Sequence, residues 1–207
     1  IGYVDSKGVW TKMSRKEAIK QGIRIVDVRW IDINKGDIDN PDMRSRLVAK
    51  DFNTGKEDGV FAATPPLEAL KFLISEAATV EAGGRKTKIL MINDVARAFF
   101  EADMRRLLCL EIPAEARSAD DDSSDNVPLL KKSFYGTRDA AANFQAEVTK
   151  FMRSVGFTPG KYNVCTFHHK ERGLRTLVHG DDFVTVGERS EAAWFRQKSA
   201  QRFELKT

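Results

Sequence analysis

Residues 174–186 read LRTLVHGDDFVTV, with apolar stretches on both sides of a short polar segment. The stretches Leu174–Val178 and Phe183–Val186 are typical of strands, and the glycine and aspartates between them are common turn residues. The pattern predicts a β-hairpin that carries Asp181 and Asp182 at its tip. Two carboxylates fixed at the rim of a buried sheet repel each other unless a cation binds between them. We therefore interpret the pair as a candidate metal site, with an ordinary structural turn as the alternative.

A third carboxylate, Asp94, follows a short apolar segment further upstream. Ile89–Ile92 predicts a buried strand, and Asp94 lies just past its end, where a sheet keeps a side chain rigidly in place. A cap for the following turn is the alternative interpretation. Three carboxylates from neighbouring strands suit two Mg²⁺ ions, because Mg²⁺ prefers oxygen ligands. Two such ions stabilise the attacking and leaving oxygens of a phosphoryl transfer, so the pattern favours this chemistry.

The rest of the chain alternates between short strands and helices. Apolar spacing and turn residues predict a hairpin of Ile23–Trp30 and Arg46–Lys50, a helix from Thr64 to Gly83, a strand at Arg106–Ile112, a loop at Ser118–Asn126, a helix at Asp139–Val155, a strand at Val164–His168, and a helix capped by Ser190 that runs toward Phe203. From Lys88 onward, this order predicts a largely antiparallel sheet backed by helices on one face, which is an α+β architecture.

The composition is that of a globular domain. The 207 residues are 42% hydrophobic and 31% charged, which predicts one large or two small domains. No stretch approaches the roughly 18 apolar residues of a membrane span, and no signal peptide is evident, so we expect no membrane association. The first residue is Ile1 rather than Met, which favours a piece of a longer protein. Cys109 and Cys165 have no CxxC partner, so we expect two reduced, buried thiols and no zinc site.

The chain is mildly basic, with a formal net charge of +4 at pH 7. Several cations are close neighbours in the sequence: Arg44, Arg46 and Lys50, then Arg105 and Arg106, then Lys131 and Lys132. Clustered positive charge favours phosphate-rich partners such as nucleic acid. An ordinary solvated surface is the alternative.

Five blocks resemble, in order and spacing, the polymerase motifs of reverse transcriptases from copia-type LTR retrotransposons. They are RLVAK at 46–50, NDVARAF at 93–99, LKKSFYG at 130–136, VGF at 155–157 and HGDD at 179–182. The similarity covers residues 22–205. It implies the fold of a right-hand polymerase, with a fingers-like region at 1–87, a palm-like region at 88–207 that contains the carboxylates, and no thumb.

The resemblance also implies a metal cluster. Asp94 and Asp181 would bridge two Mg²⁺ ions, with Mn²⁺ as the alternative metal, and Asp182 would complete the cluster. These three aspartates would be both the metal ligands and the catalytic residues.

Further matches imply contacts with substrates. Arg46 and Lys50 would contact the triphosphate of a dNTP, and a guanidinium suits this task because it binds two phosphate oxygens at once. Phe99 would lie under the incoming sugar and exclude a ribose 2′-hydroxyl, with a place in the core as the alternative. Lys131 and Lys132 would touch the nucleic-acid backbone or simply solvent.

Three residues depart from the family pattern. Asp139 stands where the family has a glutamine that binds the incoming nucleotide, and its charge would repel a triphosphate unless Arg138 or a metal compensates. His179 and Gly180 stand where the family has tyrosine and valine, at positions expected to face the nucleic acid. These changes leave the three aspartates intact, but they bear on nucleotide affinity and turnover.

Together these features predict an RNA-directed DNA polymerase, in which a primer 3′-hydroxyl attacks a dNTP. Its partners would be an RNA or DNA primer–template, dNTPs and, in a parent Pol polyprotein, thumb, RNase H and integrase segments. By resemblance its place would be inside the cell, in a cytoplasmic particle or the nucleus. A degenerate or domesticated remnant that binds nucleic acid without synthesis is the alternative. A nucleotide cyclase is a third hypothesis, which the Arg46–Lys50 and Lys131–Gly136 blocks disfavour.

Overall fold

The chain forms two compact units, each assembled from separate segments of the sequence. The computed structural model describes residues 2–53, 55, 58–79, 88–117 and 125–206. Unit 1 contains Ile1–Val60 and Phe99–Asn143, and unit 2 contains Phe61–Ala98 and Phe144–Thr207. Each unit has its own sheet and its own core, so each is described by itself.

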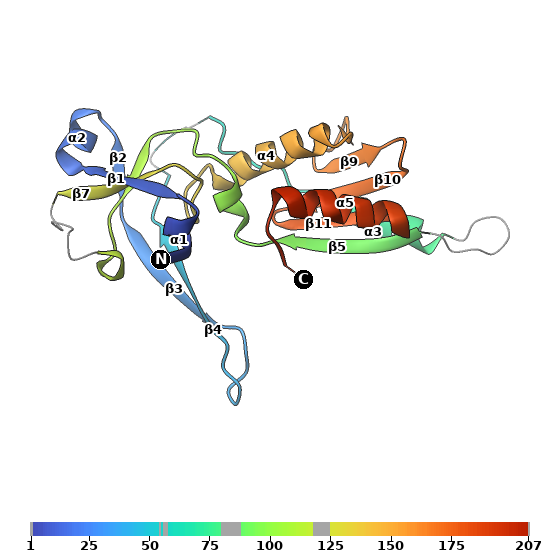
Figure 1. Ribbon diagram of the computed structural model, residues 1–207, viewed down its shortest axis with the longest axis horizontal. Coiled ribbons are helices and arrows are strands. Elements are labelled where there is room, and N and C mark those ends of the chain that lie inside the picture. The colour runs from blue at the N-terminus through green and yellow to red at the C-terminus, as the bar shows by residue number, and fades with distance from the viewer. Residues whose placement is uncertain (1, 54, 56–57, 80–87, 118–124, 207) are drawn as a thin grey trace. The chain divides into compact units, whose positions relative to one another are not determined.

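Unit 1 is built on a four-stranded sheet in the order β1–β7–β6–β2 and on a separate two-stranded hairpin, β3–β4 (Figure 1). Its elements are α1 (Gly2–Ser6), β1 (Trp10–Ser14), α2 (Arg15–Lys20), β2 (Arg24–Val26), β3 (Val28–Asn34), β4 (Met43–Ala49), η1 (Ala98–Glu101, whose first residue belongs to unit 2), β6 (Leu108–Leu110), η2 (Ala114–Ala116) and β7 (Asn126–Leu130). β2 runs parallel to β6, whereas the other strand pairs of this unit are antiparallel.

Aromatic side chains fill the core of unit 1. The ring of Trp10 stacks on Phe134 with centroids 5.9 Å apart, and Phe100 lies 5.6 Å from Phe134. The turn after these aromatics requires a glycine, because Gly136 has a φ of 84° and a Cβ there would overlap the backbone of Ala49. The carbonyl of Tyr135 accepts a hydrogen bond from the Ala49 amide at 2.7 Å. This close approach fastens β4 to the segment before α4.

The segment predicted as one strand, Ile23–Trp30, forms two strands that belong to different sheets. Asp27 separates them: its carboxylate accepts a hydrogen bond from the Val28 amide at 2.8 Å, and its carbonyl accepts one from the Lys50 amide at 2.8 Å. β2 therefore joins the four-stranded sheet, while β3 pairs with β4. The predicted hairpin is confirmed, but the prediction of one continuous strand was wrong.

Unit 2 is built on a six-stranded antiparallel sheet in the order β12–β5–β11–β10–β9–β8. Its elements are α3 (Leu67–Ala78), β5 (Lys88–Val95), β8 (Thr158–Pro159), β9 (Thr166–His169), β10 (Leu174–His179), β11 (Asp182–Glu188), α5 (Arg189–Arg202) and β12 (Leu205–Lys206), together with α4 (Ala140–Ser154), which begins in unit 1 and belongs to unit 2 from Phe144. The mixture of antiparallel sheet and helices confirms the predicted α+β class.

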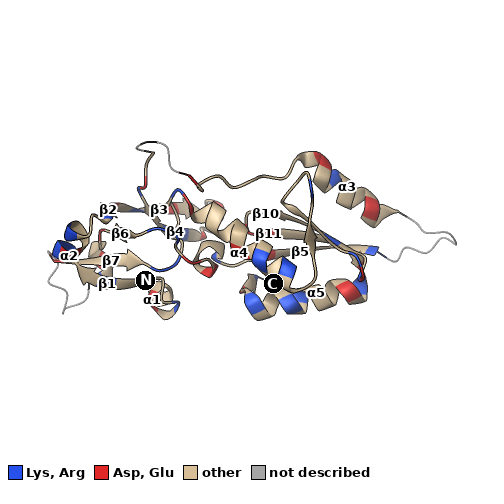
Figure 2. Cartoon of the chain, turned by 90° about the horizontal axis from the view of Figure 1, so that it is seen from above, with Lys and Arg blue, Asp and Glu red and all other residues tan. Residues whose placement is uncertain are grey.

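Helices cover both faces of the sheet in unit 2, and the prediction of helices on one face only was wrong. Leu73 of α3 packs with Val184 and Val186 on one face. The alternate residue Phe183 points the other way, where its ring stacks on Phe195 of α5 at 6.5 Å. Figure 2 shows α3 and α5 on opposite sides of β5, β10 and β11. β11 is apolar and buried on both sides, so each of its faces needs a helix.

Two helices differ from their predicted ends. α3 ends at Ala78, before the predicted stop at Gly83, which lies outside the described residues. α5 begins at Arg189 with Glu188 as its N-cap, so Ser190 lies within the first turn and the prediction that it caps the helix was wrong. Most of the predicted loop at Ser118–Asn126 also lies outside the described residues.

Cys109 and Cys165 are both free and buried, as predicted. Burial raises the pKa of each thiol, which keeps both protonated and unreactive at neutral pH. In the described part of the chain, no helix is long and apolar enough to cross a membrane.

Candidate active site

The predicted hairpin is present, and its turn is tight. His179 pairs with Asp182, so β10 and β11 are joined by only two residues, Gly180 and Asp181. Gly180 has a φ of 60°. Asp181, the second loop residue, does not have a positive φ, because Arg97 is the only described non-glycine residue that does. A positive φ at the first of two loop residues is the backbone of a type II′ turn, which favours glycine at that position. The turn therefore depends on Gly180, and its conformation determines the position of the Asp181 backbone.

Strands β5 and β11 lie side by side (Figure 1), and Asp94, Asp182 and the turn residue Asp181 are carried at one end of this strand pair. Asp182 is directly opposite Asp94 in the strand register, so both side chains lie on the same face of the sheet. The Val95 amide donates a hydrogen bond to the carbonyl of Asp181 at 2.9 Å, which ties the turn to β5. Asp94 is a paired residue inside β5, and the prediction that it lies past the strand end was wrong. The apolar run ends at Ile92, but the backbone pairing continues.

The negative charge of this cluster is only partly compensated. Partial desolvation, the first cause, and the neighbouring carboxylates of Asp181 and Asp94 raise the pKa of Asp182, although the residue is exposed. His179 and Lys206 act in the opposite direction on that pKa, because both side chains lie near the carboxylate. A cation placed among the three aspartates would relieve their repulsion.

Lys206 is a site residue that the sequence analysis missed. It lies on β12, directly opposite Asp94 in the register and on the other side from Asp182. Its Nζ donates to both oxygens of Asp94, at 2.7 Å and 2.8 Å. The only sequence signal was a basic residue soon after the last helix, and the two-residue strand that positions it has no periodicity to detect.

The donor chemistry of the cluster fits divalent cations that prefer oxygen ligands, such as Mg²⁺. Among the described residues, however, no three histidine, cysteine, aspartate or glutamate side chains are grouped so as to coordinate one ion. Asp94 already faces the Lys206 ammonium with both of its oxygens. The metal ligands Asp94, Asp181 and Asp182 therefore stay a prediction that the donor set supports.

The predicted nucleotide-binding residues Arg46, Lys50 and Phe99 lie in unit 1. Arg46 is exposed on β4, opposite Ile31 of β3. Lys50 follows β4, and its ammonium pairs with the carboxylate of Asp27 at 2.5 Å. Phe99 lies in η1, half-buried, with its ring 4.9 Å from that of Tyr135. Their contacts with a dNTP stay predictions, and so does the nucleic-acid contact of His179 and Gly180 in unit 2.

Asp139 is a buried residue within unit 1. Arg106 donates to its Oδ1 from Nε at 3.1 Å and from Nη2 at 3.0 Å, and Asn143 donates to its Oδ2 at 2.8 Å. The same guanidinium contacts Asp51, which also pairs with Arg24 at 3.0 Å. The negative charge of Asp139 is therefore compensated by Arg106. Its predicted contact with a dNTP is untested.

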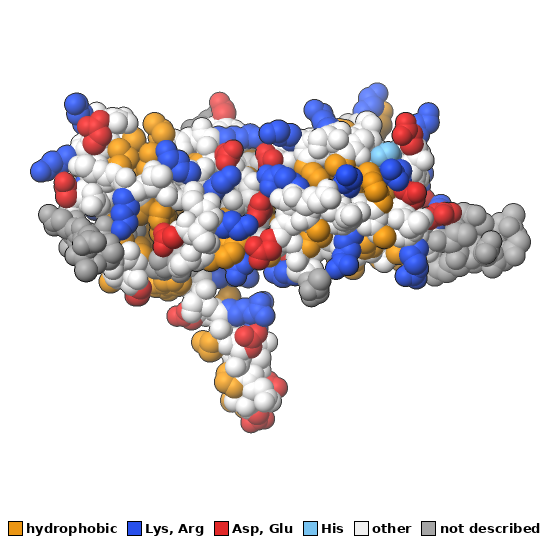
Figure 3. All heavy atoms as spheres, viewed as in Figure 1, with side chains coloured by type: hydrophobic (Ala, Val, Ile, Leu, Met, Phe, Trp, Pro, Cys, Tyr) orange, Lys and Arg blue, Asp and Glu red, His pale blue; other side chains and the backbone are white. Residues whose placement is uncertain are grey.

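Many of the clustered cations have carboxylate partners. Arg44 contacts Asp42 at 3.1 Å and Lys132 contacts Asp103 at 2.7 Å, while Lys131 is exposed. Figure 3 shows Lys and Arg side chains interspersed with Asp and Glu over the visible face. Charge alone therefore gives little support to a phosphate-binding patch at these clusters.

Comparison with known protein families matches residues 11–207 to the family described as "Reverse transcriptase (RNA-dependent DNA polymerase)". The chain belongs to the copia-type reverse transcriptase family. The match covers nearly the whole chain, including β5, the β10–β11 hairpin and β12. No curated protein matches this reverse transcriptase chain. Family membership identifies a polymerase class whose substrates are nucleic acids, and the three aspartates occupy the place where strands β5 and β11 meet.

Proposed function

We propose that the chain is the core of an RNA-directed DNA polymerase, with Asp94, Asp181 and Asp182 as its catalytic metal ligands. The observation that supports this most is the register of β5 and β11, in which Asp94 faces Asp182 beside the turn residue Asp181. Such a carboxylate cluster on a rigid sheet, in a chain of this family, suits nucleotidyl transfer.

In the proposed reaction, the primer 3′-hydroxyl loses its proton to solvent and its oxygen bonds to the α-phosphorus of a dNTP. The bond between that phosphorus and the oxygen that bridges to the β-phosphate breaks, which releases pyrophosphate. When bound, two divalent cations would stabilise the attacking and leaving oxygens. Asp94 and Asp182 would keep the negative donor oxygens on one face of the sheet, because each belongs to a paired strand. The tight turn would limit how far Asp181 moves during the reaction.

The family resemblance supplies the other proposed roles. Arg46 and Lys50 would contact the triphosphate, and Phe99 would favour deoxynucleotides over ribonucleotides. Binding of the triphosphate by Lys50 would require its ion pair with Asp27 to open. Because that pair is half-exposed, opening it would cost no more than about 1 kcal/mol.

The test is Mg²⁺-dependent incorporation of dTTP on a poly(rA)–oligo(dT) primer–template. The protein is assayed as the 207-residue chain and with any segment that its gene encodes after Thr207. The Asp181→Asn, Asp182→Asn double variant is the matched control, since it keeps size and shape and removes two charges. Incorporation by the wild type that the double variant abolishes would support the proposal. Equal incorporation by both proteins would exclude these aspartates as metal ligands.

A binding module without synthesis is the second candidate. The observation that favours it is the Lys206 ammonium on Asp94, at a residue that a polymerase would need for metal. Under this hypothesis the chain would bind primer–template with the same affinity in the wild type and the double variant, and neither protein would incorporate dTTP.

A further inference from the structure

Lys206 occupies a place that a metal ion would also need. Its Nζ lies within hydrogen-bond distance of both oxygens of Asp94, and the two side chains are 51% and 37% exposed. When both oxygens of a carboxylate accept hydrogen bonds from one ammonium, a second cation must compete with that ammonium for the same oxygens. An ammonium beside a divalent cation is also repelled by it.

The position of Lys206 is fixed by the segment that carries it. The Ala96 amide donates to the carbonyl of Glu204 at 2.7 Å, and Arg97 pairs with the Glu204 carboxylate at 3.1 Å. Just before this segment, Phe203 is buried, with its ring 5.0 Å from Phe151 and 6.0 Å from Phe183. Core packing and strand pairing thus position the backbone that carries Lys206, which keeps its half-exposed side chain within reach of Asp94.

We propose that Lys206 is a resident counter-ion of the carboxylate cluster that a divalent cation displaces when it binds. The inference rests on the proposed function, because it takes Asp94 to be a metal ligand. In the metal-free protein, the ammonium offsets the repulsion among Asp94, Asp181 and Asp182. Displacement of the ammonium lowers the apparent affinity for metal, so Lys206 sets the cation concentration at which the site fills.

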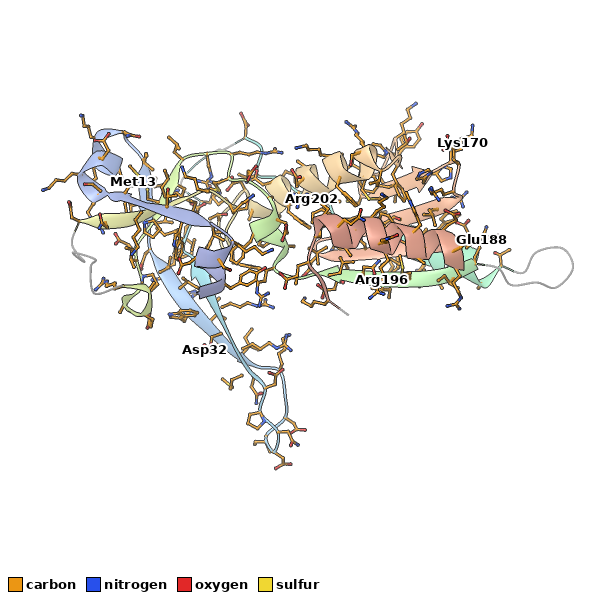
Figure 4. The ribbon with its side chains drawn as sticks, in the orientation of Figure 1. Met13, Asp32, Lys170, Glu188, Arg196 and Arg202 are labelled. Carbon is orange, nitrogen blue, oxygen red and sulfur yellow. The ribbon has the colours of Figure 1, made fainter. Side chains whose placement is uncertain are left out.

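The experiment measures Mn²⁺ binding to the full chain by electron paramagnetic resonance, without nucleotide or nucleic acid. Lys206→Gln removes the competing charge, and we expect it to bind Mn²⁺ about two- to fivefold more tightly than the wild type. Lys206→Arg keeps a cation at the same place and should change the affinity by less than about twofold. Lys170→Gln is the matched control, because Lys170 is exposed on the turn between β9 and β10 (Figure 4). It removes the same charge without touching the cluster and should bind as the wild type does.

A second measurement follows the displacement itself. In protein with ¹³C-labelled lysine, we expect the side-chain signal of Lys206 to move toward that of an exposed lysine during a Mg²⁺ titration. The spectrum of Lys206→Arg assigns this signal by its absence. A Lys206 signal that stays unchanged at saturating Mg²⁺ would overturn the proposal.

The outcomes separate this inference from the proposed function. If the wild type and Lys206→Gln bind Mn²⁺ equally, and the Asp181→Asn, Asp182→Asn variant does not, the metal site stands and the counter-ion role is wrong. If none of the proteins binds Mn²⁺, both the metal site and the competition are wrong. Tighter binding by Lys206→Gln, but not by Lys170→Gln, supports both.

Discussion

At the residue scale, the ion pair of Asp139 with Arg106 changes what the aspartate is expected to do. An aspartate at this position would repel a nucleotide if it were exposed, but here it is buried and paired with a guanidinium that also contacts Asp51. Only Asp139 was visible as a departure from the family pattern. Arg106 lies 33 residues away from Asp139 in the sequence, so no local pattern connects the two.

Replacement of Arg106 by methionine should therefore destabilise unit 1 strongly. It would leave the buried Asp51 with Arg24 and the Arg138 amide, and Asp139 with Asn143, at a cost of about 3 kcal/mol in the free energy of unfolding. The neighbouring Arg105→Met, at an exposed position, should change stability by less than about 0.5 kcal/mol. Urea denaturation of both variants checks this. A double variant, Arg106→Met with Asp139→Asn, should recover part of the loss, and no recovery would contradict the pairing.

A second residue pair predicts how stability depends on pH. Arg15 donates to both oxygens of Glu111, at 2.8 Å and 2.6 Å, and this lowers the pKa of Glu111 from its ordinary value of 4.5. Because the folded pKa is the lower one, the stabilisation is present above pH 4.5 and is lost as pH falls through the folded value.

Glu111→Gln should thus be less stable than the wild type at pH 7 by up to about 1 kcal/mol, since the pair is partly exposed. The difference should shrink toward zero as the pH falls below 4.5, as measured by urea denaturation at several pH values. A difference that is constant from pH 7 to pH 3 would show that the ion pair is not its cause.

At the scale of elements, the sequence predicted what is local and missed what depends on distant pairing. The β10–β11 hairpin and helix α4 have strong periodicity, and both are confirmed. β1, β7 and β12 were not predicted, because strands this short have too little periodicity to be detected and are defined by their pairing with other strands. The same limit applies to the candidate site: the aspartates stand out in the sequence, whereas Lys206 reaches Asp94 only through the register of β12.

The turn of the hairpin makes a prediction of its own. Valine is the usual family residue at position 180, but a β-branched residue at a φ of 60° is strained even though the space around Gly180 is open. Gly180→Val should lower the free energy of unfolding by about 1–2 kcal/mol. Gly180→Asn is the control and should cost less, because asparagine tolerates this conformation. Thermal unfolding measures the stability of both variants. A valine variant that is as stable as the wild type or more stable would show that the turn adopts another backbone conformation without cost.

At the scale of the whole molecule, the chain passes twice through each unit. The predicted fingers-like region at 1–87 and palm-like region at 88–207 are consecutive blocks, whereas the two compact units alternate along the sequence. The assignment of fingers and palm stays a prediction. β1 pairs with β7 and β2 with β6, so residues before position 60 share a sheet with residues after position 99.

A fragment of residues 1–87 should therefore fail to fold alone. It would contain the two outer strands, β1 and β2, without the central strands β7 and β6 that join them, so the sheet and much of the core would not form. We expect the circular dichroism of the fragment to show no cooperative thermal transition. When residues 88–207 are added, we expect the circular dichroism of the mixture to show folded structure again. A cooperative transition in the isolated fragment would contradict this.

The pairing of Trp10 with Leu130 also sets the order of events during synthesis. A ribosome that adds about 5–20 residues per second exposes β1 on the order of ten seconds before β7 emerges. Throughout that interval Val9 and Trp10, which the finished protein buries, are in contact with water or with a chaperone. Nascent chains of this protein are thus vulnerable to aggregation until Leu130 has left the ribosome, and slower translation prolongs that risk.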